Sequence, residues 1–448
     1  MPIRYYSTNR NNFFFEENIS FREALFRGMA KDKGLYMPDL IPTFSRKELD
    51  NLKTIALYYH EIAFKVLRKF LHEDIKDEKL SEIIKEAYDF EVPFEHAKED
   101  AYILRLDKGP TASFKDFAAR FMARIMNELK GGEDITILVA TSGDTGSAVG
   151  EAYKGLNGFN VYILYPKDEV SNIQKRQLDC IGGNVKSISI DGKFDDCQKL
   201  VKSAFMDKDL AKLNLTSSNS INIGRVLPQI CYYFYAYAIL DFEELVFSIP
   251  SGNFGNALGC EMARRMGLPV SKIIIATNEN DEFPRFLGTG LYKKIMPSKS
   301  CLSNAMNVGN PSNLARFFDL YGGHLDEEGN IMRLPDVEEM RKRFFSISID
   351  DCLTLKTIKD TYERFGLILE PHGAVAFAAL NEYLRSNKAK AVSLETADPA
   401  KFPEIIQKEL GFSPKIPKSL ELILNKNCHS EILSNNYQEL KEYLLSNR

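Results

Sequence analysis

The sequence predicts an α/β protein with a helical N-terminal domain over residues 1–95 and a larger core over 96–448. The first observation is that apolar side chains before residue 95 recur at the helical period, most clearly in 54–71. The apolar positions of that stretch are Leu57, Phe64, Leu67 and Leu71. The second observation is that, from about residue 100, short β-rich runs each precede a loop and a helical pattern. This alternation is typical of open, parallel-rich sheets with helices on both faces.

The β-rich runs define the core, in which we expect a nested small domain at about 116–215. They lie at 135–140, 161–165, 185–190, 245–249, 272–276 and 391–394. The apolar run 226–240 reads as one buried helix, and the last thirty residues also read as helix. Turn-rich segments at about 280–350 suggest an irregular insertion. Ligands of such folds bind beyond the carboxyl ends of the strands, so the loops there are the places to search.

Composition narrows the class of protein. The chain has 448 residues, of which 44% are hydrophobic and 27% charged, which excludes collagen-like and disordered classes. A formal net charge of −4 gives no basic surplus for nucleic acid. The seven cysteines are odd in number and form no CxxC, so we expect reduced thiols, neither a disulfide framework nor a metal site. No signal peptide or membrane span is apparent, which predicts a cytoplasmic protein without a membrane partner.

The loop GPTASFKDF at 109–117 places Lys115 among aromatic and small apolar residues at the start of a helix. Burial lowers the pKa of an amine and makes it a nucleophile suited to Schiff-base formation. The alternative is a lysine that packs its alkyl stem near a helix start and keeps its charge in water.

Two further loops could bind anions at helix N-termini. Residues 251–256 (SGNFGN) offer glycines and amide donors without an acidic residue, as a phosphate site requires, but match neither a Walker A motif nor a dinucleotide fingerprint. Residues 142–147 (SGDTGS) contain Asp144, which favours a small carboxylate over a highly charged phosphate. An ordinary capped turn remains the alternative for both loops.

Three more segments have polar side chains in comparable positions. The segment 219–225 (NSINIGR) opens an apolar helix and could hold a phosphate through Arg225, or could be an ordinary helix cap. The segments 395–399 (ETADP) and 370–373 (EPHG) read, taken alone, as turns. No HExxH or GxSxG motif occurs, so metal and serine hydrolysis are not supported.

A reactive lysine, a phosphate loop and a second anion loop together suggest pyridoxal phosphate. GPTASFKDFAARF closely resembles the cofactor-lysine motif of threonine synthases, and PSGNFGN resembles their phosphate loop. Other segments resemble the family in its order, namely ATSGDTGSAV, ILYP, CIGGNV, SINIGR, CYYF, ATNEND, LSNAMNV, EPHGAVA and TADPAKF. The beginning, SFREALFRGMAKDKGLYMPDLIP, resembles the long-chain members.

This resemblance implies a fold type II pyridoxal-phosphate enzyme and suggests a role for each matching residue. Lys115 matches the lysine that holds the cofactor, and Thr396 matches the hydroxyl facing the pyridine nitrogen. The loop around the cofactor phosphate corresponds to Ser251, Gly252, Asn253, Phe254, Gly255 and Asn256, where the family often has Asp in place of Asn256. The loop near the substrate α-carboxylate corresponds to Ser142, Gly143, Asp144 and Thr145. The candidates for the substrate phosphate are Ser220, Asn222 and Arg225.

The activity implied by the resemblance is the conversion of O-phospho-L-homoserine and water to L-threonine and phosphate, the last step of threonine biosynthesis. Two alternatives stay open: a pyridoxal-phosphate lyase that releases phosphate without forming threonine, and a non-catalytic cofactor-binding homologue. The sequence leaves a monomer and a homodimer equally open.

Overall fold

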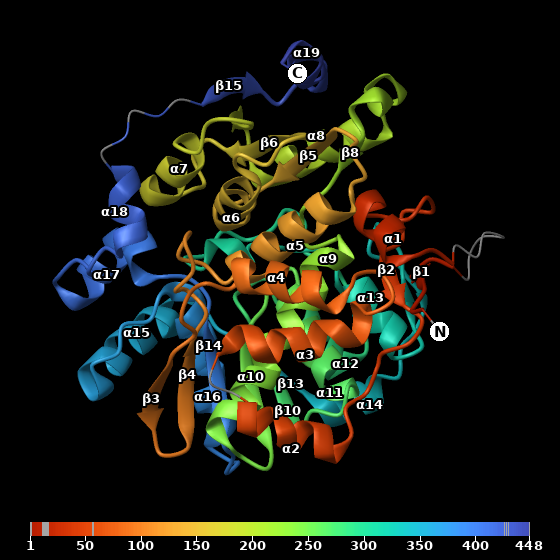
Figure 1. Ribbon diagram of the computed structural model, residues 1–448. Coiled ribbons are helices and arrows are strands. Elements are labelled where there is room, and N and C mark those ends of the chain that lie inside the picture. Colours follow the sequence, from red (N-terminus) through yellow and green to blue (C-terminus); the bar gives the residue numbers. More distant parts are fainter. Residues whose placement is uncertain are drawn as a thin grey trace.

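The computed structural model describes residues 2–10, 18–55, 58–424, 426, 428 and 430–447. Its core contains two open sheets, seen in the lower and upper halves of Figure 1. The larger sheet has the strand order β13-β10-β9-β14-β4-β3 and is parallel except for β3. Its strands are β3 (Phe94–Lys98), β4 (Ala101–Arg105), β9 (Leu245–Pro250), β10 (Val270–Thr277), β13 (Phe344–Ser348) and β14 (Ala391–Glu395).

The smaller sheet is entirely parallel and has the order β15-β7-β6-β5-β8. Its strands are β5 (Ile135–Ala140), β6 (Phe159–Pro166), β7 (Val185–Asp191), β8 (Leu215–Thr216) and β15 (Glu431–Ser434). Every residue of β5 is buried, as expected for a central strand covered on both faces. The predicted runs at 135–140, 161–165, 185–190, 245–249, 272–276 and 391–394 all lie within observed strands.

Helices cover both faces of each sheet. The helices of the smaller sheet and its connections are α5 (Lys115–Leu129), α6 (Asp144–Tyr153), α7 (Asn172–Asp179), α8 (Phe194–Met206), η1 (Lys208–Leu213) and α19 (Tyr437–Ser446). Those of the larger sheet are α9 (Ile223–Val226), η2 (Leu227–Ile230), α10 (Cys231–Leu240), α11 (Gly255–Arg265), α15 (Asp351–Phe365), α16 (Pro371–Leu384), η4 (Pro399–Lys401) and α17 (Pro403–Leu410). Helix α18 (Lys418–Leu424) packs on α7. The predicted single helix 226–240 is divided because Pro228 cannot donate to an α-helical ladder.

The N-terminal region contains more than the predicted helices. Strands β1 (Tyr5–Ser7) and β2 (Tyr36–Pro38) pair antiparallel. The helices of this region are α1 (Phe21–Arg27), α2 (Arg46–Ile55), α3 (Tyr59–Leu71) and α4 (Asp77–Ala87). The predicted helix 54–71 therefore corresponds mainly to α3, and Leu57 lies outside the described residues.

The region 280–350 is more than the expected irregular insertion, because β13 completes one edge of the larger sheet. Its other elements are α12 (Glu282–Thr289), η3 (Asn304–Met306), α13 (Leu314–Leu320), β11 (His324–Leu325), β12 (Ile331–Arg333) and α14 (Val337–Arg343). The expectation that the last thirty residues are helical is also wrong in part. Strand β15 from this segment extends the smaller sheet, which therefore draws on chain well beyond the predicted 116–215.

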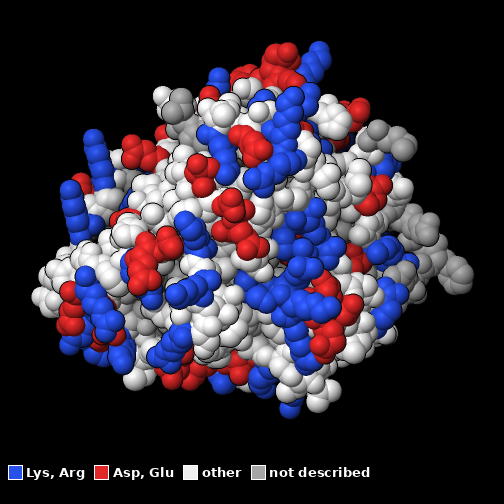
Figure 2. Space-filling model, turned by 90° about the horizontal axis from the view of Figure 1, so that it is seen from below, with Lys and Arg blue, Asp and Glu red and all other residues white. Residues whose placement is uncertain are grey.

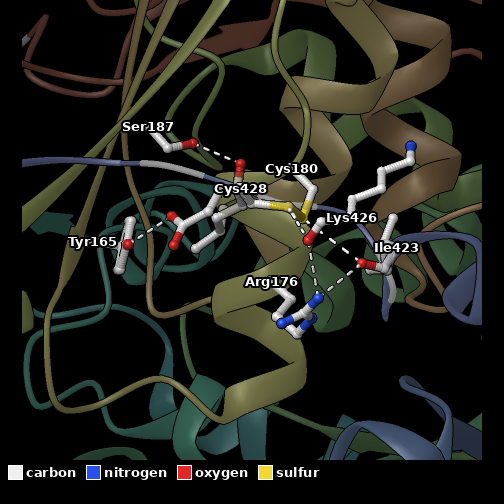
Figure 3. The surroundings of a disulfide bond; sticks show 9 residues. Tyr165, Arg176, Cys180, Ser187, Ile423, Lys426 and Cys428 are labelled. Carbon is white, nitrogen blue, oxygen red and sulfur yellow. Dashed lines mark hydrogen bonds between the residues drawn. A yellow bond between two sulfur atoms is a disulfide. The ribbon is translucent and has the colours of Figure 1, made fainter.

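A disulfide joins Cys180, the residue that caps the C-terminus of α7, to Cys428 in the segment between α18 and β15 (Figure 3). The two cysteines are 248 residues apart in the sequence, and their Cα atoms are 4.7 Å apart. Nearby, the Arg176 guanidinium donates to the carbonyl of Lys426 at 3.1 Å. The prediction that all cysteines are reduced is therefore wrong for this pair, because sequence spacing does not reveal a contact created by tertiary packing.

Reduction of this disulfide should lower the midpoint of thermal unfolding. A cross-link across so long a loop restricts the unfolded chain, and the chain-entropy model gives a contribution of up to about 5 kcal/mol. Differential scanning calorimetry with and without dithiothreitol measures the shift. The Cys180→Ser variant should unfold at the lower temperature under both conditions, whereas Cys352→Ser, which replaces an exposed free thiol, should behave like the parent. A parent protein indifferent to dithiothreitol would contradict this prediction.

On the face shown in Figure 2, basic and acidic side chains are interspersed. None of the described helices is long and apolar enough to cross a membrane. Across the same residues, no group of three or more His, Cys, Asp or Glu side chains is arranged to hold a metal ion.

Candidate active site

A cavity between the two sheets brings together most of the residues singled out in the sequence. The predicted residues that line it are Lys115, Ser142, Asp144, Thr145, Ser220, Arg225, Ser251, Gly252, Asn253, Phe254, Gly255, Asn256 and Thr396. Gly143 and Asn222 are not among its lining residues. The cavity lies where loops follow the carboxyl ends of β5, β9 and β14, as the α/β pattern predicts.

Lys115 is the first residue of α5, and its loop is held against the segment that follows β14. The Phe114 N–H donates to the Thr396 carbonyl at 2.8 Å, and the Asp398 N–H donates to the Ala112 carbonyl at 3.0 Å. These two backbone hydrogen bonds place Lys115 and Thr396 on the same cavity. The loop is therefore held in place by the core of the larger sheet.

The Lys115 amine lines the cavity instead of extending into bulk water. Its Nζ lies 4.1 Å from the centroid of the Phe114 ring. Burial lowers the pKa of Lys115 from 10.5 to about 8; the Asp144 carboxylate opposes this shift, and the cations Arg225 and Lys401 add to it. An amine with this pKa is available as a nucleophile and as a base near neutral pH.

The loop between β9 and α11 forms a cradle for a phosphate group. The first N–H groups of a helix have no intrahelical acceptor and favour an anion. A glycine is required at position 252 for this loop to pack closely against η3, because a Cβ there would lie 2.7 Å from the Met306 Cα. The Asn256 Oδ1 accepts hydrogen bonds from the hydroxyls of Tyr232 (2.5 Å) and Tyr233 (2.6 Å). The buried Asn256 Nδ2 is thereby oriented and has no partner in the described part of the protein, as expected for a donor that binds a ligand.

Thr396 is held by a buried carboxylate. Its hydroxyl donates to Glu370 Oε1 at 3.3 Å. Glu370 is the N-cap of α16, and its carboxylate also accepts from the N–H groups of His372 and Gly373. Burial and the neighbouring charge of Glu370 raise the pKa of Glu395 well above its usual range. This arrangement leaves Thr396 as a neutral polar group at the cavity wall.

His372 also lines the cavity, although the sequence indicated only a turn at this position. Its Nδ1 lies 2.5 Å from Glu370 Oε2, and its Nε2 accepts from the Ala305 N–H at 3.0 Å. Because the backbone N–H can only donate, we assign the proton to Nδ1. His372 therefore fixes η3, whose Ala305 and Met306 contribute to the cavity wall. The only signal in the sequence was a histidine next to a helix-initial proline.

The loop before α6 presents two hydroxyls to the cavity. Thr141 Oγ1 accepts from the N–H groups of Gly143 (2.9 Å) and Gly146 (2.8 Å) and so fixes the loop. Within the described chain, the Ser142 and Thr145 hydroxyls line the cavity without a protein hydrogen-bond partner. Gly143 contributes through its backbone shape: it has φ 127°, and a Cβ there would lie 2.6 Å from the Gln174 side chain.

Arg225 is a buried cation without a carboxylate partner in the described part of the chain. Only 3% of its surface is exposed, and its Nη1 donates to the Ser218 carbonyl at 2.5 Å. Its Nε has no hydrogen-bond partner among the residues that the structure describes, and burial lowers the pKa of Arg225 to about 10. A buried guanidinium with unused donors on a cavity wall is suited to bind an anion.

Asn222 does not share this role, contrary to the sequence prediction. Its Oδ1 caps α9 by accepting from the Gly224 N–H, and its Nδ2 donates to the carbonyls of Leu25 and Ser217. The side chain thus connects the site loop to the N-terminal region and has no free group for a ligand. Local sequence could not separate this structural role from a binding role.

The fold and the site define a pyridoxal-phosphate-dependent enzyme of fold type II. Residues 90–394 match the family model described as pyridoxal-phosphate dependent enzyme. Residues 4–88 match the model of the threonine synthase N terminus, and residues 373–444 match the model of the threonine synthase C-terminal region. The chain therefore belongs to the threonine synthase family.

The sequences of individual relatives align with nearly the whole chain. The threonine synthase of Haemophilus influenzae is 37% identical over 438 residues, which cover 96% of this chain and 97% of the relative. That of Escherichia coli is 40% identical over 408 residues, or 90% and 91% of the two chains.

Solved structures give the same result. The crystal structure of the Escherichia coli threonine synthase has a TM-score of 0.89 at 37% identity and covers 99% of this chain and 100% of its own. A threonine synthase from Brucella melitensis with bound pyridoxal phosphate has a TM-score of 0.89 at 32% identity, with coverages of 99% and 98%. The predicted family, fold type, threonine synthase function, enzyme class and cofactor are thereby confirmed.

Proposed function

We propose that this protein converts O-phospho-L-homoserine and water to L-threonine and inorganic phosphate, using the residues of this cavity in the roles that follow. The observation that carries the proposal is the Arg225 guanidinium, which has no carboxylate partner among the described residues and shares one cavity with Lys115 and a separate phosphate loop. Two anion sites beside one reactive amine suit a phosphorylated amino acid together with a phosphorylated cofactor.

The chain's own residues would hold pyridoxal phosphate at three points. Lys115 would bind its aldehyde carbon, and the 251–256 loop would bind its phosphate through helix-initial N–H groups and the free Asn256 Nδ2. Thr396, held by Glu370, would face the pyridine nitrogen. When bound, the cofactor supplies an electron-accepting ring that stabilises negative charge next to the substrate amine.

The substrate would lie between the other two anion-binding elements. The Ser142 and Thr145 hydroxyls would bind its α-carboxylate, and Ser220 and Arg225 would bind its phosphate. Lys115, once its amine is free, would take the proton from the α-carbon and return protons later, because it stays within reach of the same carbons. Arg225 would stabilise the negative charge of the departing phosphate.

Product analysis tests this proposal directly. Holoenzyme incubated with O-phospho-L-homoserine should release L-threonine and phosphate in equal amounts, measured by chromatography and a phosphate assay. A 2-oxo acid with ammonia and no threonine would instead support a lyase. Absence of turnover with retained cofactor would support a non-catalytic homologue.

The pKa of Lys115 predicts how the apoenzyme captures its cofactor. The free amine is the nucleophile, and its fraction increases with pH up to the pKa of about 8. The rate of capture should therefore rise about tenfold per pH unit below 8 and level off above it. Stopped-flow absorbance measures this rate. Asp144 raises the pKa of Lys115, so the rate of capture by the Asp144→Asn variant should level off at a lower pH. An unchanged pH profile would contradict the assignment of Lys115 as the capturing amine.

A further inference from the structure

A buried ion pair lies directly behind the cavity. The Lys401 Nζ is 2.6 Å from Asp144 Oδ1, and the side chains of the two residues are 0% and 4% exposed. The same carboxylate oxygen accepts from Gln174 Nε2 at 2.9 Å, and the Lys401 ammonium also donates to the Thr111 carbonyl at 3.2 Å. Lys401 is not among the residues that line the cavity, whereas Asp144 is. The contact of Lys401 with the cavity wall is therefore made through Asp144.

The two donors to Asp144 come from segments that are bonded to each other. Lys401 ends η4, five residues after Thr396, and its carbonyl accepts from the Ser171 hydroxyl at 3.0 Å. Ser171 caps α7, the helix that carries Gln174. Lys401, which follows the larger sheet in the chain, thus places its ammonium group beside a loop of the smaller sheet. A buried ion pair is weak evidence for stability, since desolvation offsets much of the attraction.

The position of Asp144 poses an electrostatic problem. It belongs to the loop that we assign to the substrate α-carboxylate, and a bare carboxylate there would repel that group in a poorly screened cavity. It would also attract the Lys115 ammonium, because Asp144 raises the pKa of that amine. A cation on the far side of Asp144 offsets part of both effects.

We propose that Lys401 is a positioning residue that neutralises Asp144, so that the 142–145 loop accepts the carboxylate of an amino-acid substrate. Gln174 holds the same oxygen and keeps Asp144 directed toward Lys401. The identity of the substrate in this inference rests on the proposed function; the charge compensation rests on the Lys401–Asp144 contact alone.

The test compares ligands with and without a carboxylate, using holoenzyme of the parent, Lys401→Met, Asp144→Asn and the double variant. O-phospho-L-homoserine carries the carboxylate, and 3-aminopropyl phosphate has the same amine and phosphate without it. Affinities are read from the change in the visible absorption of the cofactor. Lys401→Met should weaken O-phospho-L-homoserine about 100-fold and change 3-aminopropyl phosphate less than about threefold. Adding Asp144→Asn should restore most of the loss.

A merely structural role predicts different results. Both ligands would then be weakened alike, and the double variant would bind no better than Lys401→Met; either outcome overturns the proposal. If Lys401→Met does not fold, the double variant is compared with Asp144→Asn. Equal affinity for O-phospho-L-homoserine in these two supports the proposal, and a carboxylate-specific loss in the double variant overturns it.

The same variants separate this inference from the proposed function. L-2-aminobutyrate has the carboxylate and propylamine lacks it, and neither carries a phosphate. Lys401→Met should weaken the binding of L-2-aminobutyrate and leave that of propylamine nearly unchanged. If the parent does not turn over O-phospho-L-homoserine, the proposed function fails, whereas the aminobutyrate comparison still tests the role of Lys401.

Discussion

Replacement of Lys115 by alanine should lower the turnover of O-phospho-L-homoserine by at least about a thousandfold and remove the covalent link to the cofactor. The reason is that one amine is expected both to hold the cofactor aldehyde and to move protons at the substrate carbons. No other lysine lines the cavity in the described part of the chain. Mass spectrometry after borohydride reduction measures the link, and a phosphate assay measures turnover.

The matched control for this variant is Lys130→Ala. Lys130 caps the other end of α5, so its replacement tests the effect of losing a lysine from the same helix outside the cavity. This control should keep both the covalent link and the activity. An active Lys115→Ala enzyme that still carries a borohydride-fixed cofactor would refute the assignment of the site.

Replacement of Arg225 by methionine should reduce kcat/KM for O-phospho-L-homoserine about 100-fold or more. Loss of a buried, charge-assisted hydrogen-bond donor to a phosphate has an effect of this size. Methionine retains much of the side-chain volume, so the change mainly removes the guanidinium. Arg225→Lys should recover part of the activity, because it restores the charge without the planar group of donors. Steady-state kinetics measures each variant.

Two comparisons show which phosphate Arg225 binds. The affinity of Arg225→Met for the cofactor should stay close to that of the parent, since the 251–256 loop holds that phosphate. The affinity for L-homoserine, which lacks a phosphate, should also be unchanged. If Arg225→Met instead loses its cofactor and keeps the parent KM, Arg225 belongs to the cofactor site.

The elements that sequence predicted well are those whose signal is local. Strand β5 coincides with the predicted 135–140 because a fully buried strand is a short apolar run between turn residues. Strands β13 and β15 were missed because their sequences are mixed in polarity and they lie at sheet edges. What decides their state is pairing with a neighbour far away in the chain, which no local period records.

The same distinction holds at the site. Lys115 and the 251–256 loop were recognisable because each lies in a short motif whose chemistry is complete within a few residues, whereas Thr396 was identified only through the resemblance to the family. Lys401 lies in the same TADPAKF segment as Thr396, but the segment indicated no role for it, since that role depends on Asp144, a partner in a distant part of the chain, and on burial of both charges. For Asn222, the local pattern suggested a ligand contact, but packing directs its amide toward Leu25.

The sequence by itself determined the class of fold, the family, the cofactor and the lysine that we expect to bind it, because these depend on local periodicity and on short motifs. The tertiary structure decided which charges meet. Among the described residues it left Arg225 without a counter-ion at the cavity, and it paired Asp144 with Lys401 behind the cavity and joined Cys180 to Cys428. Such pairings arise from the desolvation and close approach of groups far apart in the chain, and only folding supplies both.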